Sequence, residues 1–510
     1  MRKFFKLLTH RVVLVGLALA IQIAVFILMV FRFQEYSIYF YSICNVLSIL
    51  AVLLLVNSRS NPGYQIAWII LILAAPVFGG LFYLLFGGNR LSRRARRKLQ
   101  QSDRKIAAAL VPDQDAAAAL EQASLRAARQ SRYIAQFAEC PVCRNTDVTY
   151  FRSGEEKFEQ LKAELKKAER FIFLEYFIVE EGIMWDSIRD ILAEKAAAGV
   201  DVRMVFDDMG CIMTLPANYP HKLESLGIRC RVFNRFIPVL SLRLNNRDHR
   251  KICIIDGKVG FTGGINLADE YINAYPKHGH WKDSAVMLRG DGVWNLTVMF
   301  LSMWEYLSGE SEAYETFRCR EPYTARSDCG FVQPYADSPL DFEAVGETVY
   351  LNLISKAENY IYITSPYLVI DNEMVTALSA AAKSGVDVRI ITPHIPDKWY
   401  VHAVSRAYYP VLVESGVHIY EYTPGFIHAK NVVCDDRYAT VGTINFDYRS
   451  LYLHFECGVW MYRSPAVMDV KADFLDTLAL CKEVTAADCR SVSLPRRLGR
   501  AILRVFAPLM

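Results

Sequence analysis

The pattern His-x-Lys-x4-Asp occurs twice in this chain, and each copy is followed at the same offsets by a glycine and an asparagine. The first copy comprises His249, Lys251, Asp256, Gly263 and Asn266, and the second comprises His428, Lys430, Asp435, Gly442 and Asn445. At average residue usage, such a match is expected at about one start in several million. Two copies in one chain therefore indicate a duplicated functional unit.

The residue types in the motif suit the chemistry of a phosphodiester. Its anionic oxygens need cationic or amide donors, and its displacement needs a nucleophile and an acid. The lysines can hold the phosphoryl oxygens, to which the asparagines add neutral donors. One histidine can attack phosphorus to give a phosphohistidine, while the other protonates the leaving alkoxide and later deprotonates the acceptor hydroxyl. We predict that both histidines, both lysines and both aspartates are catalytic residues, the aspartates by orienting a partner or by holding two halves together.

The sequence favours a reaction without a metal or another cofactor. It contains no HExxH helix and no Asp/Glu cluster with the spacing of metal ligands. Cys140 and Cys143 form one CxxC pair, but no second pair follows to complete a zinc site. The other cysteines are scattered, and several lie in apolar strand-like runs, which indicates buried free thiols.

Sequence similarity between the two copies extends well beyond the motifs, with a period of about 180 residues. Residues 167–174 match 356–363, and residues 198–203 match 384–389. Each half reads as strand, helix, strand, helix, strand with glycine at the turns, which predicts an α/β fold with a mostly parallel sheet in each half. We expect the two halves to pack in a pseudo-two-fold arrangement. Within each motif the histidine and the lysine alternate along an extended segment, so both face one shared site.

The N-terminus is strongly apolar, in a chain that is 53% hydrophobic. Three runs approach the roughly 20 residues needed to cross a bilayer, namely residues 12–31, 36–56 and 64–86. The first run ends without a small-residue cleavage site, so we expect it to be retained. We predict a helical membrane region over residues 1–88 with two or three segments, because one segment could be re-entrant.

Basic residues follow the apolar runs and recur at the C-terminus, while the net charge is only +4. The cluster that begins at Arg90 favours a cytoplasmic position for the catalytic portion by the positive-inside rule. We predict a basic, Ala-rich helical linker over residues 89–132, a first domain over 133–330 and a second over 331–510. The tail from Leu494 to Met510 fits an interfacial amphipathic helix or a packed terminal helix equally well.

Further polar residues are candidates for substrate binding. Asn266 and Asn445 belong to the repeated pattern. Glu175 lies at a strand end, where it could line the site or merely cap the sheet, and Glu270 is open to the same two interpretations. Ser450 and Glu456 complete the predicted set.

The chain resembles the bacterial cardiolipin synthases of the phospholipase D superfamily. Besides the duplicated motif, the resemblance rests on short segments at residues 270–271, 281–283, 365–367, 445–450 and 455–456. It implies two phospholipase D-like domains and the joining of two phosphatidylglycerol molecules into cardiolipin with release of glycerol. It also implies His249 as the nucleophile, His428 as the general acid and base, anionic membrane lipids as partners, and the bacterial cell membrane as location. Lys282 stands where that family usually has Arg, and His454 where Asn is usual.

Other activities are compatible with the same motifs. A hydrolytic phospholipase D, or a transphosphatidylase using another alcohol, would differ only in the acceptor. A nuclease is disfavoured, because apolar segments serve no purpose for nucleic acid and no groove of interleaved basic and aromatic residues is visible. A membrane scaffold with a degenerate site is disfavoured because both motifs are complete. The sequence does not predict an oligomeric state.

Overall fold

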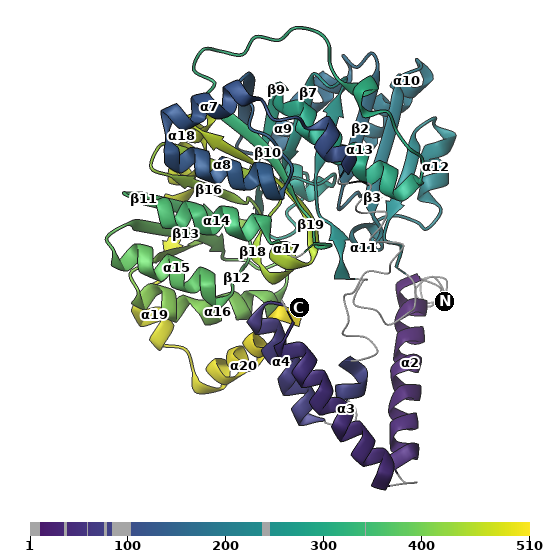
Figure 1. Ribbon diagram of the computed structural model, residues 1–510, viewed down its shortest axis with the longest axis vertical. Coiled ribbons are helices and arrows are strands. Elements are labelled where there is room, and N and C mark those ends of the chain that lie inside the picture. Colours follow the sequence, from purple (N-terminus) through teal and green to yellow (C-terminus); the bar gives the residue numbers. More distant parts are fainter. Residues whose placement is uncertain are drawn as a thin grey trace.

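The structure is a computed structural model that describes residues 11–34, 38–58, 60–75, 79–83, 102, 104–236, 245–341 and 343–509. Two α/β halves lie side by side, and a group of N-terminal helices extends from them (Figure 1). The basic cluster predicted to follow the apolar runs falls outside the described residues.

The first half is built on a seven-stranded sheet. In spatial order its strands are β1 (Thr146–Phe151), β9 (Ala285–Gly290), β7 (Val259–Gly263), β6 (Ile252–Ile255), β2 (Phe171–Tyr176), β3 (Asp201–Asp207) and β4 (Arg229–Phe233). Apolar and β-branched residues dominate the central strands, which are buried on both faces.

The second half repeats this order strand by strand. It runs β10 (Phe331–Asp337), β19 (His454–Tyr462), β17 (Tyr438–Gly442), β16 (Asn431–Cys434), β11 (Tyr360–Thr364), β13 (Asp387–Pro393) and β14 (His418–Tyr422), with β20 (Cys481–Glu483) added at the edge. The predicted α/β class and the predicted internal repeat are therefore confirmed.

The prediction of mostly parallel sheets is wrong. Along these two strand orders, only β2, β3 and β4, and their counterparts β11, β13 and β14, are parallel neighbours, while the other adjacent strands are antiparallel. The reason is that β6–β7 and β16–β17 are hairpins, which need no crossover helix. Their tight turns hold Asp256-Gly257 and Asp435-Asp436 at positive φ, the backbone that type I′ hairpin turns require.

The motif aspartates lock these turns to the strand beside them. Asp256 accepts backbone N–H bonds from Glu169, Arg170 and Phe171 at 2.8 to 2.9 Å. Asp435 accepts the equivalent three bonds, from residues 358–360, at 2.7 to 3.0 Å. Each aspartate thus stabilises its own half, at the end of the strand that lies away from the motif histidine. The structure does not bring either one to the predicted catalytic groups.

Helices cover the outer faces and fill the space between the sheets. Their bounds are α7 (Gln114–Ala123), α8 (Leu125–Phe137), α9 (Gly154–Leu165), α10 (Ile183–Ala197), α11 (Asp208–Cys211), α12 (Tyr219–Ser225), α13 (Gly292–Ser308), α14 (Val345–Lys356), α15 (Asn372–Lys383), α16 (Trp399–Glu414), α17 (Tyr448–Tyr452), α18 (Ala466–Leu478), α19 (Ala486–Arg490) and α20 (Leu494–Val505), with short 3-10 turns η2 (Asp269–Ile272), η3 (Tyr314–Phe317) and η4 (Ala507–Leu509). Helix α13 contacts β6 and β9 of the first sheet and β10 of the second. One apolar core therefore runs through both halves.

The N-terminal helices are α2 (Arg11–Gln34), α3 (Ile38–Val56) and α4 (Pro62–Ala74). Asn61, which caps α4, ties them to the second half by donating to Asp371 at 3.0 Å and to Tyr452 at 2.9 Å. Within the described part of the chain, no helix has both the length and the apolar character needed to cross a bilayer. The predicted membrane crossings are therefore not confirmed.

We predict that Asp256→Asn and Asp435→Asn weaken folding without removing a catalytic group. Asparagine tolerates positive φ but lacks the charge that the three N–H groups contact, so each change should cost about 1–3 kcal/mol of unfolding free energy. Thermal melting should show the loss, and turnover per folded molecule should stay near that of the wild type. Abolished turnover with an unchanged melting temperature would contradict this role.

Candidate active site

The two halves exchange short strands at their interface, and this exchange places both motif histidines. Strand β5 (Arg247–Asp248), just before His249, pairs with β19 of the second half. Strand β15 (Gly425–Ile427), just before His428, pairs with β8 (His280–Lys282) of the first half. The pairing continues through the histidines, whose backbone N–H groups donate to Phe455 O at 2.9 Å and to Lys282 O at 2.7 Å.

Each motif histidine contacts a carboxylate from the opposite half. His249 Nδ1 lies 2.9 and 3.0 Å from the two oxygens of Glu456. His428 Nδ1 lies 2.6 Å from Asp283 Oδ2. Thr443 donates to Glu456 Oε2. The exchange of strands therefore completes two His–carboxylate pairs that neither half contains alone.

These contacts and the burial of the rings determine the tautomer and the protonation of both imidazoles. Because a carboxylate accepts, each Nδ1 carries a proton and each Nε2 keeps its lone pair for substrate. Burial and the neighbouring lysines hold the pKa of His249 well below its usual range. Burial, and then Lys430, lower the pKa of His428 to about 4, although Asp283 acts in the opposite direction. Both rings are thus neutral near pH 7, as a nucleophile and a general base must be.

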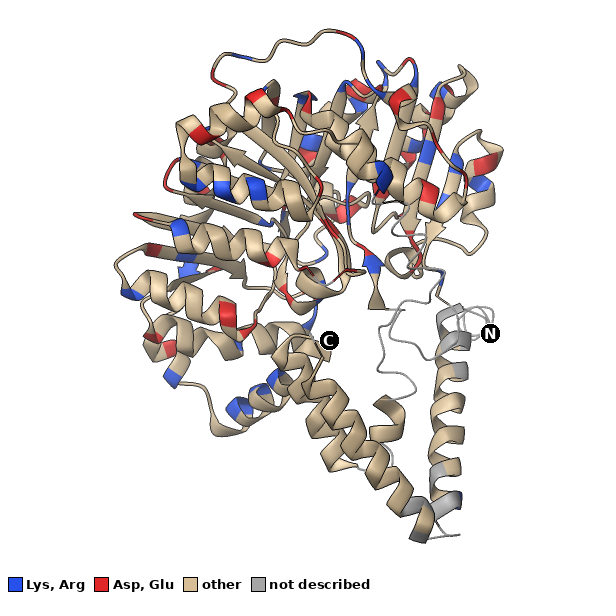
Figure 2. Ribbon diagram, viewed as in Figure 1, with Lys and Arg blue, Asp and Glu red and all other residues tan. Residues whose placement is uncertain are grey.

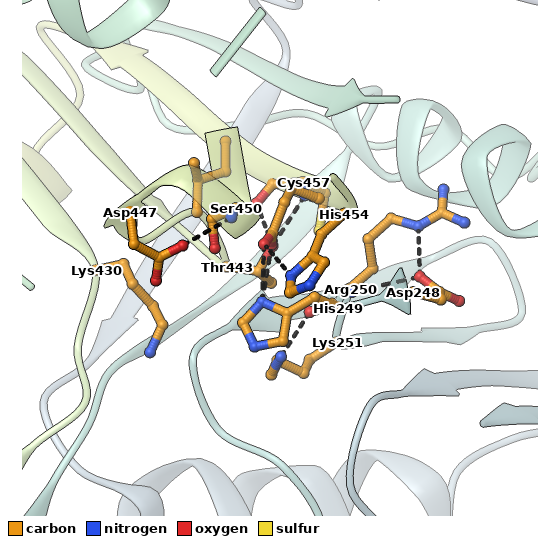
Figure 3. Close-up of polar contacts among 12 residues, drawn as sticks. Asp248, His249, Arg250, Lys251, Lys430, Thr443, Asp447, Ser450, His454 and Cys457 are labelled. Carbon is orange, nitrogen blue, oxygen red and sulfur yellow. Dashed lines mark hydrogen bonds and ion pairs between the residues drawn. The ribbon is translucent and has the colours of Figure 1, made fainter. Parts of the chain in front are cut away.

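The two motif lysines are buried beside the histidines. Lys251 Nζ donates to the backbone oxygen of His249 at 2.5 Å, and Lys430 donates likewise to that of His428. Burial lowers the pKa of Lys251 to about 8 and that of Lys430 to about 7. In Figure 3 the side chains of His249, Lys251 and Lys430 extend toward the same side of the site. A bound anion would therefore relieve the unfavourable proximity of buried cations.

Comparison with known proteins identifies the relatives of this arrangement. The family described as "Cardiolipin synthase, PLD-like domain" matches residues 161–275 and 350–478, and the family "Phospholipase_D-nuclease N-terminal" matches residues 46–88. A cardiolipin synthase of Geobacillus kaustophilus is 34% identical over 470 residues, which is 92% of this chain and 92% of that protein. An uncharacterized protein of Streptococcus mutans is 44% identical over 90% of this chain and 99% of its own length.

This chain belongs to the cardiolipin synthase family of phospholipase D-like proteins. Membership confirms the resemblance inferred from the sequence and makes the chain an enzyme of a phosphatidyltransferase family. The crystal structure of phosphatidylserine synthase from Haemophilus influenzae has the same fold, with a TM-score of 0.55 and 14% identity over 75% of this chain and 97% of that chain.

Three of the predicted binding residues follow the second histidine motif in the chain, namely Asn445, Ser450 and Glu456. Glu456 contacts His249 directly. Asn445 Oδ1 and Ser450 Oγ are buried and make no hydrogen bond to any described residue, so they are available to a substrate hydroxyl. Ser450 lies at the site beside Asp447, whose carboxylate accepts its backbone N–H at 2.8 Å (Figure 3).

The other three predicted binding residues are engaged elsewhere. Glu175 pairs with Arg250 at 2.6 Å, on the face of the motif strand opposite His249 and Lys251. Glu270 accepts from Lys277 at 2.7 Å. Asn266 accepts from the backbone of Ile178 at 3.0 Å and donates to Tyr271 at 2.7 Å. They support the site without facing it as free donors or acceptors.

Sequence reasoning missed Asp283 and Thr443. Asp283 belongs to the segment 281–283 of the family resemblance. It follows His249 by 34 residues, whereas Glu456 follows His428 by 28, so the repeat does not align the two carboxylates. The signal that could have found Asp283 is its equivalence to Glu456: Asp283 follows β8, and Glu456 follows the segment of β19 that pairs with β5.

We predict that Glu456→Gln and Asp283→Asn each lower kcat by about two to four orders of magnitude. An amide can hold the ring but does not favour the Nδ1–H tautomer or stabilise an imidazolium. Rates in lipid micelles would be compared with circular dichroism to verify folding. Glu421→Gln is the matched control, because Glu421 also contacts a histidine, His394, at 2.9 Å but lies outside the motifs. A loss in the control as large as that in the site variants would refute the assignment.

Proposed function

We propose that this enzyme joins two phosphatidylglycerol molecules into cardiolipin and releases glycerol. The observation that carries the proposal is the pair of buried, neutral histidines, each held by a carboxylate of the opposite half and each accompanied by its buried motif lysine. That arrangement supplies a nucleophile, a proton carrier and a cationic cradle for one phosphodiester. The cardiolipin synthase relatives support the choice of lipid.

In the first half-reaction, His249 Nε2 attacks phosphorus of the donor lipid. A P–N bond forms, the P–O bond to the glycerol headgroup breaks, and protonated His428 gives its Nε2 proton to the leaving alkoxide. Lys251 and Lys430 hold the non-bridging oxygens. His428 is neutral in the empty site, so the anionic lipid and Asp283 together must raise its pKa for it to act as the acid.

In the second half-reaction, a hydroxyl of another phosphatidylglycerol replaces glycerol. Neutral His428 takes the hydroxyl proton, the oxygen attacks phosphorus, and the P–N bond to His249 breaks. Neither step requires a metal. We assign the acceptor hydroxyl to Ser450 Oγ and Asn445 Oδ1. Their burial without a hydrogen-bond partner among the described residues supports this assignment. An acceptor that excludes water makes the reaction transfer instead of hydrolysis.

Purified protein in micelles containing phosphatidylglycerol alone should yield cardiolipin and an equal amount of glycerol. Phosphatidic acid as the main product would contradict the proposal and indicate hydrolysis. Adding other alcohols would reveal a different acceptor range.

The two histidines should differ in a labelling experiment. With phosphatidylglycerol labelled in the phosphate, His249→Ala should show no covalent label and no turnover. His428→Ala should also lose turnover, but it should still acquire label slowly, because the nucleophile remains. Label on His249→Ala protein would contradict the assigned roles.

We further propose that the enzyme works on the surface of the bacterial cell membrane. Helix α20 carries exposed Leu494, Leu498 and Ile502, at 78%, 62% and 54% exposure, spaced by four residues along one face. Its polar positions are arginines 496, 497, 500 and 504, and it has no acidic residue, as Figure 2 shows. Such a helix fits an anionic lipid interface, where each arginine adds about 1 kcal/mol. Helix α20 also lies beside α4 (Figure 1).

Trp substitution can locate α20 relative to the lipid. In Leu498→Trp, the added fluorescence should be quenched by brominated phosphatidylglycerol in bilayers, and less by brominated phosphatidylcholine. Leu480→Trp is the control, because Leu480 is also exposed, at 54%, but lies outside the helix. Equal quenching at the two positions would contradict insertion of α20.

A further inference from the structure

A second buried histidine stands beside His249, and the proposed reaction gives it no role. His454, on β19, has 9% of its side chain exposed. Its ring centre lies 5.5 Å from that of His249, and its Nδ1 lies 3.6 Å from Glu456 Oε1. Neither of its ring nitrogens makes a hydrogen bond to a described residue. Burying an imidazole in this way is unfavourable unless it has a partner.

The three side chains form a compact set of metal-ligand types. One ligand atom from each of His249, His454 and Glu456 lies within 4.8 Å of the others, and all three residues are buried. Zinc ligands of these types sit about 2.0–2.2 Å from the ion, so tetrahedral neighbours are about 3.3 Å apart. The contacts of 2.9 Å and 3.6 Å to Glu456 Oε1 lie on either side of that value.

The surroundings of Glu456 suit such a site. Thr443 holds Oε2 by a hydrogen bond, which leaves Oε1 facing both rings. A ligand carboxylate fixed by an outer hydrogen bond is a usual feature of metal sites. Two imidazole nitrogens and one carboxylate favour Zn²⁺, Co²⁺ or Ni²⁺ over Mg²⁺, which prefers oxygen ligands.

We propose that a divalent transition metal ion binds His249 Nδ1, His454 and Glu456 Oε1 and thereby switches the enzyme off. The ion takes the place of the Nδ1 proton of His249, and the neutral ring then carries its proton on Nε2. The lone pair that attacks phosphorus is lost, so no P–N bond can form. The inhibition, although not the binding, rests on the proposed role of His249 as nucleophile. The nearby lysines repel the ion, so binding is weaker than at a structural zinc site.

The test uses the full chain in detergent micelles with Co²⁺ as the probe of binding and Zn²⁺ as the inhibitor. Co²⁺ should give visible absorption bands of a nitrogen-liganded site, with saturation at one ion per chain. Zn²⁺ should displace Co²⁺, and over the same concentrations it should suppress cardiolipin formation. A chelator should restore turnover, and Mg²⁺ should have no effect.

His454→Asn should weaken Co²⁺ binding by at least about tenfold. The Zn²⁺ concentration that halves the variant's own metal-free rate should rise by the same factor. His454→Gln gives a second variant if the first folds poorly. His402→Asn is the matched control. His402 lies 4.0 Å from Glu421, near His394, but Arg406 already pairs with that carboxylate at 2.6 Å.

Absence of Co²⁺ bands in the wild type would overturn the metal site, as would binding unchanged by His454→Asn. Binding that leaves turnover intact would overturn the switch. A failure of the proposed function can be told apart from these outcomes. It would already appear in the product and labelling experiments, which contain no added metal.

Discussion

The site depends on the exchange of strands between the halves. Because β5 pairs with β19 and β15 pairs with β8, each histidine begins on a strand that extends the other half. The carboxylate that fixes its tautomer arrives by the same pairing. A shift of the halves by one residue would turn each carboxylate away from its ring, since side chains alternate along a strand. The apolar core around α13 is shared by both halves, so it helps to fix the register between them. That register in turn keeps each carboxylate against its histidine.

The charges of the site balance only when substrate is absent. Lys251 and Lys430 in their charged forms are matched by Asp283 and Glu456, while both histidines are neutral. A phosphodiester adds one negative charge to this buried set, so uptake of one proton becomes favourable. That proton is the one the leaving alkoxide requires. In the proposed reaction, binding of the anionic lipid would therefore itself favour protonation of His428, the general acid.

The sequence predicted the features that depend on residues near one another in the chain. The repeat predicted two equivalent α/β halves, and strand alternation predicted that His249 and Lys251 share a face. The alternation of strands and helices predicts parallel pairing, so it does not predict the antiparallel hairpins, although Asp256-Gly257 is a hairpin signal. The role of Asp256 as a turn lock and the partnership of Asp283 with His428 both depend on contacts between distant segments. Neither spacing nor composition in one sequence encodes such contacts.

The N-terminal helices contact the part of the second half that carries Ser450, the residue assigned to the acceptor hydroxyl. Helix α17 carries Ser450 at its centre and Tyr452 at its end, and Tyr452 is bonded to Asn61 at the start of α4 and to Asp371. The apolar helices are thus anchored to the short helix that presents an unpartnered hydroxyl at the site. In the proposed reaction a phosphohistidine could react with either acceptor, so exclusion of water near α17 would favour transfer to lipid over hydrolysis.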